Sequence, residues 1–196
     1  MQIIDNKLES ILEQPHIAKP LQAFSDMLLQ WAKIHNLTGI KDSKSLQEQI
    51  YDSLLPINFL QPFSTCIDIG SGAGFPALML ACYYSSSTFY LLEPRKKRVS
   101  FLENAIINMG LKNVKVIADY SYNIKGLKGD LITSRAVCKS DILVRDSKHL
   151  LAQNGYYLLY KGTNTSNEAN LLCDMNVKTF NHLYRTYIYA CFAKTA

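Results

Sequence analysis

The stretch with the clearest chemical meaning is "DIGSGAGFP", residues 68–76. Three glycines, Gly70, Gly72 and Gly74, fall within five positions, and an acid, Asp68, comes just before them. Such a density of glycine lets a ligand approach the backbone closely. Because the stretch follows an apolar run, we expect it to leave a buried strand and to begin a helix, where α/β proteins often bind ligands. We therefore expect a side chain added at Gly70 to enter the space of a ligand.

The spacing separates two classes of cofactor. A dinucleotide fingerprint reads G-x-G-x-x-G and binds a pyrophosphate, whereas this stretch reads G-x-G-x-G, with Phe75 in the sixth position. A carboxylate such as Asp68 is unfavourable beside a phosphate and favourable beside a cation. S-adenosyl-L-methionine is cationic and phosphate-free, and its carboxylate can accept hydrogen bonds from N–H groups at a helix start. The loop therefore favours this cofactor, and we include Gly72 in its site.

A second acid supports this interpretation. Glu93 ends the next apolar run, 23 residues after Gly70, at about the separation expected for an acid that binds the ribose hydroxyls. Together these features favour a methyltransferase, and a nucleotide-dependent oxidoreductase is the alternative enzyme.

The methyl acceptor depends on other residues. Methylation of a pyrimidine C5 needs a covalent cysteine, usually preceded by proline, but Cys138 in "DLITSRAVCK" lacks that proline. We expect Cys138 to be a packing cysteine. The Asn/Asp-Pro-Pro-aromatic string typical of exocyclic amine methylation does not occur. A purine N7 has a free lone pair and no proton to lose, so alignment with the methyl group can supply most of the catalysis. The sequence identifies no catalytic side chain.

The elements that must position these residues fall into two parts. Within residues 1–60, "NKLESILEQ" and "LQAFSDMLLQWAKIH" place apolar residues at helical spacing, with Trp31 as an anchor. A third helix, "SKSLQEQIYDSLLPI", would begin at Ser43 or Ser45 and end near Pro56. We expect these helices to cap residues 61–196 within one compact unit.

From residue 64 onward, strands and helices alternate. The expected strands are "TCIDIG", "TFYLLE", "NVKVIA", "DLITSRAV", "YYLLYKG", "VKTFNHLY" and "RTYIYACFA". Gly110 should close the helix "KKRVSFLENAIINMG", and Gly155 should separate the following helix from the fifth strand. This pattern predicts an α/β fold with a mostly parallel, seven-stranded sheet and an antiparallel edge.

Length, composition and charge indicate the class of protein and its cellular compartment. A chain of 196 residues suits one domain with a core. The five scattered cysteines are typical of reduced thiols in a cytoplasmic protein, and the isolated histidines argue against a metal site. No apolar run suits a membrane span, and the N-terminus has no signal-peptide pattern. Residues 1–49 carry a net charge of −1 and residues 50–196 of +6, a balance compatible with a nucleic-acid partner. We expect a monomer.

Seven short motifs occur in order along nearly the whole chain. They are "NLTGI" (36–40), "DSLLP" (52–56), "DIGSGAGFP" (68–76), "KRVSFLEN" (97–104), "LKNVKV" (111–116), "ITSRAV" (132–137) and "KG" (161–162). With them the chain resembles the RsmG (also called GidB) family of bacterial 16S ribosomal RNA guanine-N7 methyltransferases. The resemblance implies a class I S-adenosylmethionine-dependent, Rossmann-like methyltransferase fold with an N-terminal helical extension. It also implies methylation of a guanine N7 in 16S rRNA, with that RNA or the small ribosomal subunit as partner.

Carried over by position, the resemblance implies that Gly70, Phe75, Arg135 and the pair Ser121 and Tyr122 contact the cofactor. Phe75 would cover the adenosyl or methionine part. Arg135 would meet the methionine carboxylate or an RNA phosphate. The structural alternative for Arg135 is a salt bridge to Asp130 or Asp68.

The chain departs from the family pattern at several positions. Gln49 stands where the family usually has histidine, and "DYSYN" (119–123) stands where it usually has Arg-x-Glu. Asp119 would then accept a hydrogen bond from the adenine amine. A non-catalytic RNA-binding module that has kept the fold is a further alternative.

The remaining polar motifs suggest two kinds of contact. The basic run Arg95–Arg98 would contact an RNA phosphate or form a solvated turn, and Lys161 would reach a phosphate or lie at a solvated strand end. Polar residues of two motifs would join the helical cap to the sheet through capping and loop hydrogen bonds, and direct contact with a base is the alternative; they are Asn36, Thr38, Asp52 and Ser53.

Overall fold

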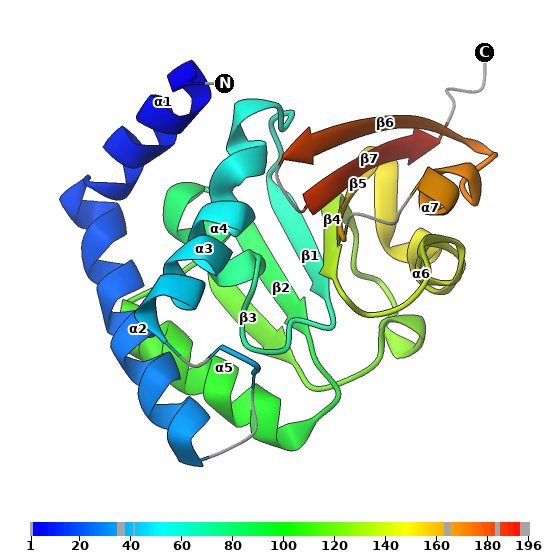
Figure 1. Ribbon diagram of the computed structural model, residues 1–196. Coiled ribbons are helices and arrows are strands. Elements are labelled where there is room, and N and C mark those ends of the chain that lie inside the picture. The colour runs from blue at the N-terminus through cyan, green and yellow to red at the C-terminus, as the bar shows by residue number, and fades with distance from the viewer. Residues whose placement is uncertain (1, 35–37, 41, 163–165, 183–184, 193–196) are drawn as a thin grey trace.

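The computed structural model describes residues 2–34, 38–40, 42–162, 166–182 and 185–192 (Figure 1). Seven strands form one sheet in the order β3-β2-β1-β4-β5-β7-β6. Their bounds are β1 Thr65–Ile69, β2 Thr88–Leu92, β3 Val114–Ile117, β4 Gly129–Arg135, β5 Leu151–Lys161, β6 Met175–His182 and β7 Arg185–Phe192. Strands β1 to β5 pair in parallel, and β7 is antiparallel to both of its neighbours. The predicted fold is confirmed, although the antiparallel strand lies one position in from the edge.

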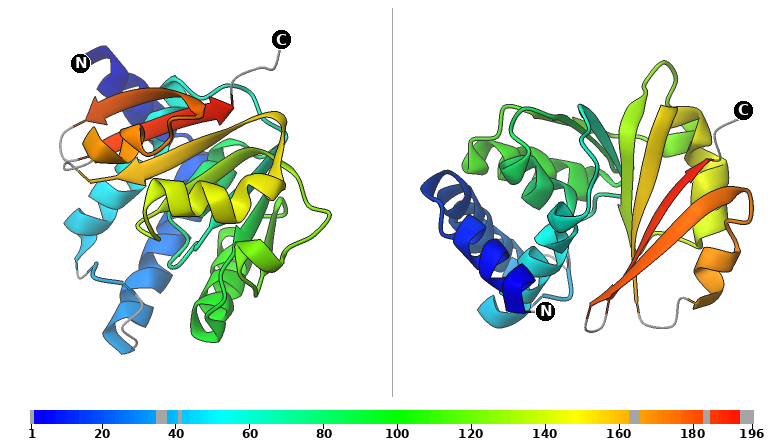
Figure 2. Two further views of the ribbon diagram at one scale, coloured as in Figure 1. Left: turned by 90° about the vertical axis from the view of Figure 1, so that its right-hand side faces the viewer. Right: turned by 90° about the horizontal axis from the view of Figure 1, so that it is seen from above.

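Helices cover both faces of the sheet (Figures 1 and 2). One face carries α4 (Ala77–Tyr83) and α5 (Lys96–Met109), and α1 (Gln2–Leu12), α2 (Pro15–Ile34) and α3 (Ser43–Leu54) pack outside them. The other face carries α6 (Ser140–Ser147) and α7 (Ser166–Asn170). Short 3-10 turns are η1 (Leu55–Asn58), η2 (Ser121–Asn123) and η3 (Lys148–Leu150). Within the described residues, no helix combines the length and apolarity needed to cross a bilayer.

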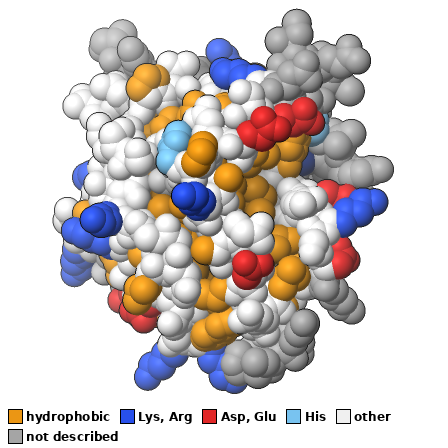
Figure 3. Space-filling model, turned by 90° about the vertical axis from the view of Figure 1, so that its left-hand side faces the viewer, with side chains coloured by type: hydrophobic (Ala, Val, Ile, Leu, Met, Phe, Trp, Pro, Cys, Tyr) orange, Lys and Arg blue, Asp and Glu red, His pale blue; other side chains and the backbone are white. Residues whose placement is uncertain are grey.

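Aromatic side chains join the N-terminal helices to the sheet domain. Phe24 of α2 lies edge-on to Phe75, with ring centroids 5.3 Å apart, and Trp31 lies at the same distance from Phe101 of α5. Phe24 and Phe101 are fully buried, so α2 shares a core with α4 and α5. Figure 3 looks onto this side of the molecule, where lysine and arginine side chains are scattered among hydrophobic patches rather than gathered.

The chain caps its helices only partly as predicted. Gly110 ends α5 with a positive φ of 69°, as expected. The N-cap of helix α3 is Asp42, whose side chain accepts a hydrogen bond from the Ser45 N–H at 2.8 Å, so the prediction of Ser43 or Ser45 as the cap is wrong. Asp42 takes this role because its extended backbone leaves the carboxylate free to turn toward the first amides.

Gly155 does not separate a helix from the fifth strand, because β5 runs through it. A Cβ atom at Gly155 would lie 3.0 Å from the backbone oxygen of Asp130 and 2.9 Å from a methyl carbon of Leu151. The glycine therefore permits the close approach of β4 and β5 next to an irregularity in their register.

The order of the strands determines where the candidate site lies. Ile69 at the end of β1 pairs with Leu92 of β2 on one side and with Ser134 of β4 on the other. The residues that follow these strand ends, including Gly70 and Glu93, therefore emerge together at one edge of the sheet, as expected for a parallel α/β protein.

Candidate active site

A cavity of about 570 Å³ lies at this edge, between the ends of β1, β2 and β4 and the turn η2. Its volume suits a nucleoside-sized ligand. The seven residues predicted to bind the cofactor all line it: Gly70, Gly72, Phe75, Glu93, Ser121, Tyr122 and Arg135. The fold therefore brings together residues that are up to 65 positions apart in the sequence.

The glycine loop uses its own amides. The N–H groups of Gly70 and Ser71 donate to the Leu92 carbonyl at 2.8 and 3.3 Å, and the Gly72 N–H donates to Glu93 Oε2 at 3.0 Å. These three donors are already paired within the protein, so hydrogen bonds from N–H groups at the helix start to the cofactor carboxylate stay a prediction. The same pairing leaves these three amides unavailable to a pyrophosphate, which disfavours a dinucleotide at this loop.

The backbone conformation and the local packing both require a glycine at position 70. It has a φ of 69°, and a Cβ atom there would lie 2.5 Å from Cγ2 of Val137, in the segment after β4. Because Val137 also lines the cavity, a side chain at Gly70 would first displace this wall residue, and its entry into the ligand space stays a prediction. Gly72 is different, because the nearest atom to an added Cβ would be 3.7 Å away, which is an ordinary van der Waals contact rather than a clash.

Asp68 lies behind the loop and not in the wall of the cavity. It is 1% exposed, and its Oδ1 accepts a hydrogen bond from the Thr133 hydroxyl at 2.7 Å. Its Oδ2 has no hydrogen-bond partner among the described residues. Burial raises the pKa of Asp68 to about 6. Any preference for a cationic ligand would therefore act through the field of this carboxylate and not through contact.

Glu93 forms part of the cavity wall and organises it. Its Oε1 accepts a hydrogen bond from the Arg95 N–H at 3.0 Å, its Oε2 bonds to Gly72, and Arg98 Nη1 lies 3.6 Å away. A carboxylate at the start of α5 offsets the unfavourable interaction between the helix dipole and the Arg95–Arg98 run. Each oxygen keeps a lone pair for a further donor, such as a ribose hydroxyl.

Arg135 joins the cavity to the N-terminal helices. Its Nη1 donates to Gln49 Oε1 at 2.9 Å and contacts Asp52 Oδ2 at 3.3 Å, while its guanidinium carbon lies 4.8 Å from the centre of the Phe75 ring. Burial lowers the pKa of Arg135. The structural alternative, a salt bridge to Asp130 or Asp68, named the wrong acid: Arg135 pairs with Asp52, whereas Asp130 accepts backbone N–H groups near the start of β1. Gln49, at the histidine position of the family, is thus a direct partner of Arg135.

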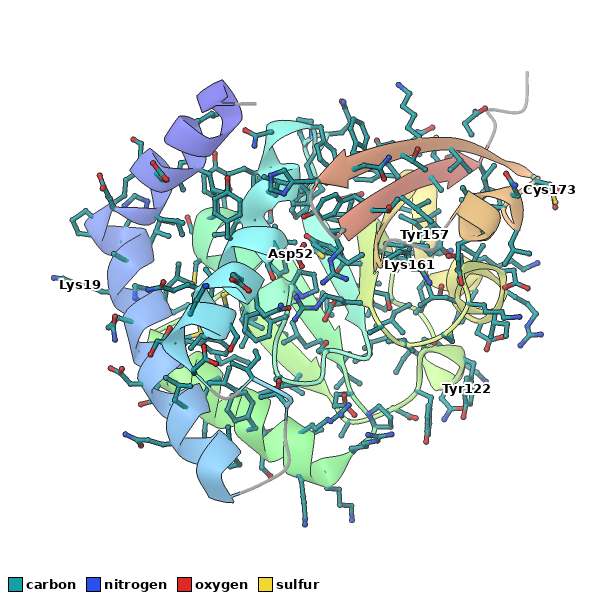
Figure 4. The ribbon with its side chains drawn as sticks, in the orientation of Figure 1. Lys19, Asp52, Tyr122, Tyr157, Lys161 and Cys173 are labelled. Carbon is teal, nitrogen blue, oxygen red and sulfur yellow. The ribbon has the colours of Figure 1, made fainter. Side chains whose placement is uncertain are left out.

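Asp52 is the centre of this connection (Figure 4). Besides Arg135, its carboxylate accepts hydrogen bonds from Arg185 Nε at 3.0 and 3.1 Å and from the Tyr187 hydroxyl at 2.8 Å. The backbone carbonyl of the next residue, Ser53, accepts a hydrogen bond from the Tyr160 hydroxyl at 2.8 Å. The expected link between helical cap and sheet is confirmed for Asp52 and Ser53. Arg185 and Tyr187 could not be found from the sequence, because no local motif marks them.

The turn η2 closes the far side of the cavity. Ser121 is buried there, whereas Tyr122 is 57% exposed and points outward in Figure 4. Asp119 Oδ1 accepts hydrogen bonds from the Tyr120 N–H and from Asn123 Nδ2, both at 2.7 Å. Asp119 also lines the cavity, so its carboxylate shapes the turn and faces the ligand space.

Cys138 is exposed and lines the cavity, so the prediction of a packing cysteine is wrong. The chain turns away from the sheet after β4, with Ala136 at a φ of 56°, and this turn leaves Cys138 outside the core. Partial desolvation raises the pKa of its thiol above the usual value. The protonated thiol that results is a poor nucleophile.

Lys161 is neither free nor solvated (Figure 4). Its Nζ donates to the Cys138 carbonyl at 2.8 Å and pairs with Glu168 at 3.1 Å, so the expectation of a solvated strand end is wrong, and contact with a phosphate stays a prediction. Thr38 lines the cavity, and Asn36, predicted to link cap and sheet, lies outside the described residues.

Comparisons with known proteins agree with this geometry. Residues 17–191 match the family described as GidB, rRNA small subunit methyltransferase G. The chain belongs to this family. The resemblance that the ordered motifs indicate is thereby confirmed.

Two curated members of the rRNA small subunit methyltransferase G family illustrate the similarity. The protein from Helicobacter hepaticus is 47% identical over 156 residues, which cover 77% of this chain and 83% of the relative. The protein from Helicobacter pylori strain HPAG1 is 42% identical over 170 residues, which cover 86% of this chain and 94% of the relative.

Solved structures share the fold at low sequence identity. A S-adenosylmethionine-dependent methyltransferase from Aquifex aeolicus has a TM-score of 0.62 at 18% identity, covering 78% of this chain and 95% of the other. A ribosomal protein L11 methylase from Lactobacillus delbrueckii has a TM-score of 0.62 at 12% identity, and the match covers 79% of this chain and 80% of the other. These likenesses show the class I methyltransferase fold.

Proposed function

We propose that the protein is a S-adenosylmethionine-dependent methyltransferase that modifies N7 of a guanine in 16S rRNA of the small ribosomal subunit. The observation that carries this proposal is the family match over residues 17–191, which includes every residue predicted to bind the cofactor. We further propose that it acts as a monomer in the cytoplasm, on the RNA itself or on the subunit.

The cavity residues suit S-adenosylmethionine by their chemistry. Glu93 keeps acceptor capacity for the ribose hydroxyls, and Phe75 and Tyr122 offer apolar ring surface. Arg135 is the donor suited to a carboxylate, since the loop amides at Gly70 and Gly72 are already paired. When bound, the cofactor supplies an electrophilic methyl group.

The acceptor chemistry follows from which side chains surround the cavity. A guanine N7 attacks with its own lone pair, so the protein has to align the two reactants and exclude water rather than remove a proton. Cys138 would have to be a thiolate for covalent catalysis, and the raised pKa of its thiol disfavours that form. These features support in-line transfer without a covalent enzyme intermediate.

Calorimetric titration tests the cofactor assignment. We expect S-adenosylhomocysteine to bind with a 1:1 stoichiometry and NADH to give no heat, because the loop amides are paired within the protein. Binding of NADH without binding of S-adenosylhomocysteine would favour the oxidoreductase. A non-catalytic RNA-binding module would bind rRNA but incorporate no labelled methyl group.

A further inference from the structure

Exposed apolar side chains gather at the mouth of the cavity. Among the described residues, six large hydrophobic side chains are markedly exposed: Ile107, Tyr120, Tyr122, Val137, Leu171 and Phe192. Tyr120, Tyr122 and Val137 all line this one cavity. Apolar side chains that are exposed beside a ligand site indicate a surface that a partner covers.

The two tyrosines form a preorganised flat surface. Their ring centroids are 5.1 Å apart with an interplanar angle of 12°, and the rings are 52% and 57% exposed. Ser121 between them is buried, so the alternating side chains on either side of it project outward. The hydrogen bonds from Tyr120 N–H and Asn123 to Asp119 hold the turn in this conformation. The stacked pair therefore presents an outer ring face without further ordering.

Positive charge accompanies this surface. Arg95 and Arg98 line the same cavity as the tyrosines, and Lys96 and Lys97 are exposed beside them. Proteins that bind single-stranded RNA combine basic grooves, which attract the phosphates, with aromatic rings on which the bases stack. An aromatic surface next to four cations matches this chemistry better than that of an apolar protein partner.

We propose that the Tyr120–Tyr122 pair is a stacking platform for an unpaired base of the RNA substrate, next to the guanine that receives the methyl group. The proposal rests on the proposed function, since it takes RNA as the substrate. The family resemblance assigns Tyr122 to the cofactor, so we assign the outer face of Tyr120 to the RNA base. The Arg95–Arg98 run binds the phosphates of the same strand.

The experiment measures the affinity of Tyr120→Ala for a labelled, single-stranded oligoribonucleotide of about 12 nucleotides. We expect binding to weaken by about 5- to 100-fold, the range measured when a stacking ring is removed. Tyr120→Trp should retain the affinity, because stacking needs the ring and not the hydroxyl. Phe192→Ala is the matched control, because it removes another exposed ring, at the end of β7. When the same RNA sequence is offered as a duplex, wild type and the three variants should bind it with equal affinity.

Two further readouts separate this proposal from its alternatives. Tyr120→Ala should bind S-adenosylhomocysteine with the wild-type affinity. If this variant loses affinity for S-adenosylhomocysteine but keeps its affinity for RNA, Tyr120 belongs to the cofactor site instead. Arg95→Ala should reduce the salt dependence of RNA binding by about one unit of slope, whereas Tyr120→Ala should leave the slope unchanged.

The failure of this proposal can be told apart from that of the proposed function. Equal affinities of wild type and Tyr120→Ala for the single strand, or no measurable binding by wild type at low salt, would overturn the platform even if the protein methylates rRNA. Loss of single-strand affinity in a protein that transfers no methyl group would keep the platform and refute the enzyme.

Discussion

Replacement of Asp52 by asparagine should loosen the junction between the N-terminal helices and the sheet. The carboxylate accepts hydrogen bonds from Arg135, Arg185 and Tyr187. An amide of the same shape can keep the Tyr187 bond, but its NH2 group would face an arginine donor, and the charge would be lost. The change thus leaves two largely buried guanidinium groups without their anion.

The magnitude follows from the burial of this cluster. Removal of one partner from a fully buried ion pair costs about 3–5 kcal/mol. The side chains of Asp52, Arg135 and Arg185 are 14%, 13% and 23% exposed, so water screens part of the interaction. We expect Asp52→Asn to lower the free energy of unfolding by about 2–4 kcal/mol.

Urea unfolding followed by tryptophan fluorescence measures this loss. Trp31 is the single tryptophan of the chain, and it packs between α2 and α5, so its signal reports whether the helices detach from the sheet. Glu48→Gln is the matched control, because it removes the same charge from an exposed position one turn earlier in α3. We expect Glu48→Gln to change the free energy of unfolding by less than about 0.5 kcal/mol.

The same variant should weaken cofactor binding. Arg135 lies over Phe75 in the cavity wall, and Asp52 and Gln49 hold it there. Without the carboxylate, we expect S-adenosylhomocysteine to bind about tenfold more weakly, the loss of roughly one charge-assisted hydrogen bond. Equal stability and equal affinity in Asp52→Asn and Glu48→Gln would refute the reasoning, because the arginines would then need no anionic partner.

Three further perturbations test other parts of the account. Burial raises the pKa of Asp68 to about 6, so the stability that the protonated carboxyl contributes is present below pH 4 and is lost as the pH rises through 6. Between pH 4 and pH 7.5, the free energy of unfolding of Asp68→Asn, measured in urea, should therefore gain up to about 3 kcal/mol relative to wild type. A difference between the two proteins that does not change with pH would contradict this. Gly70→Ala should lower the free energy of unfolding by about 2–4 kcal/mol, because of the positive φ and the clash with Val137. The double variant that also carries Val137→Ala should unfold at a higher urea concentration than Gly70→Ala alone. If it does not, the clash is unimportant. Cys138→Ser should keep wild-type methyl transfer, because the protonated thiol takes no part in it, and loss of turnover with intact cofactor binding would point to a covalent intermediate.

The sequence predicts well what local pattern and strand order determine. The alternation of apolar runs located all seven strands, and the rule that ligands bind beyond the carboxyl ends of parallel strands brought Gly70, Glu93 and Arg135 to one cavity. Gly110 was identified correctly because the C-terminal end of a helix needs a left-handed residue at that position.

Contacts between distant segments could not be predicted in this way. The partner of Arg135 is 83 positions away on α3, and nothing in either local sequence specifies the pairing. Gly155 was assigned to a boundary between elements, whereas it lies against the backbone of Asp130, and no local pattern predicts the contact of Gly70 with Val137. Cys138 was placed in the core by the average behaviour of cysteine, but the turn after β4 exposes it.

The most direct test of the central claim is the identity of the methylated nucleoside. Small ribosomal subunits from cells that lack this protein would be incubated with the purified protein and isotopically labelled S-adenosylmethionine, and the 16S rRNA digested to nucleosides for mass spectrometry. The account predicts label in N7-methylguanosine, with about one methyl group per RNA molecule at a single guanine. Label in a C5-methylpyrimidine or a base methylated on its exocyclic amine, or no label in RNA while S-adenosylhomocysteine still binds, would contradict it.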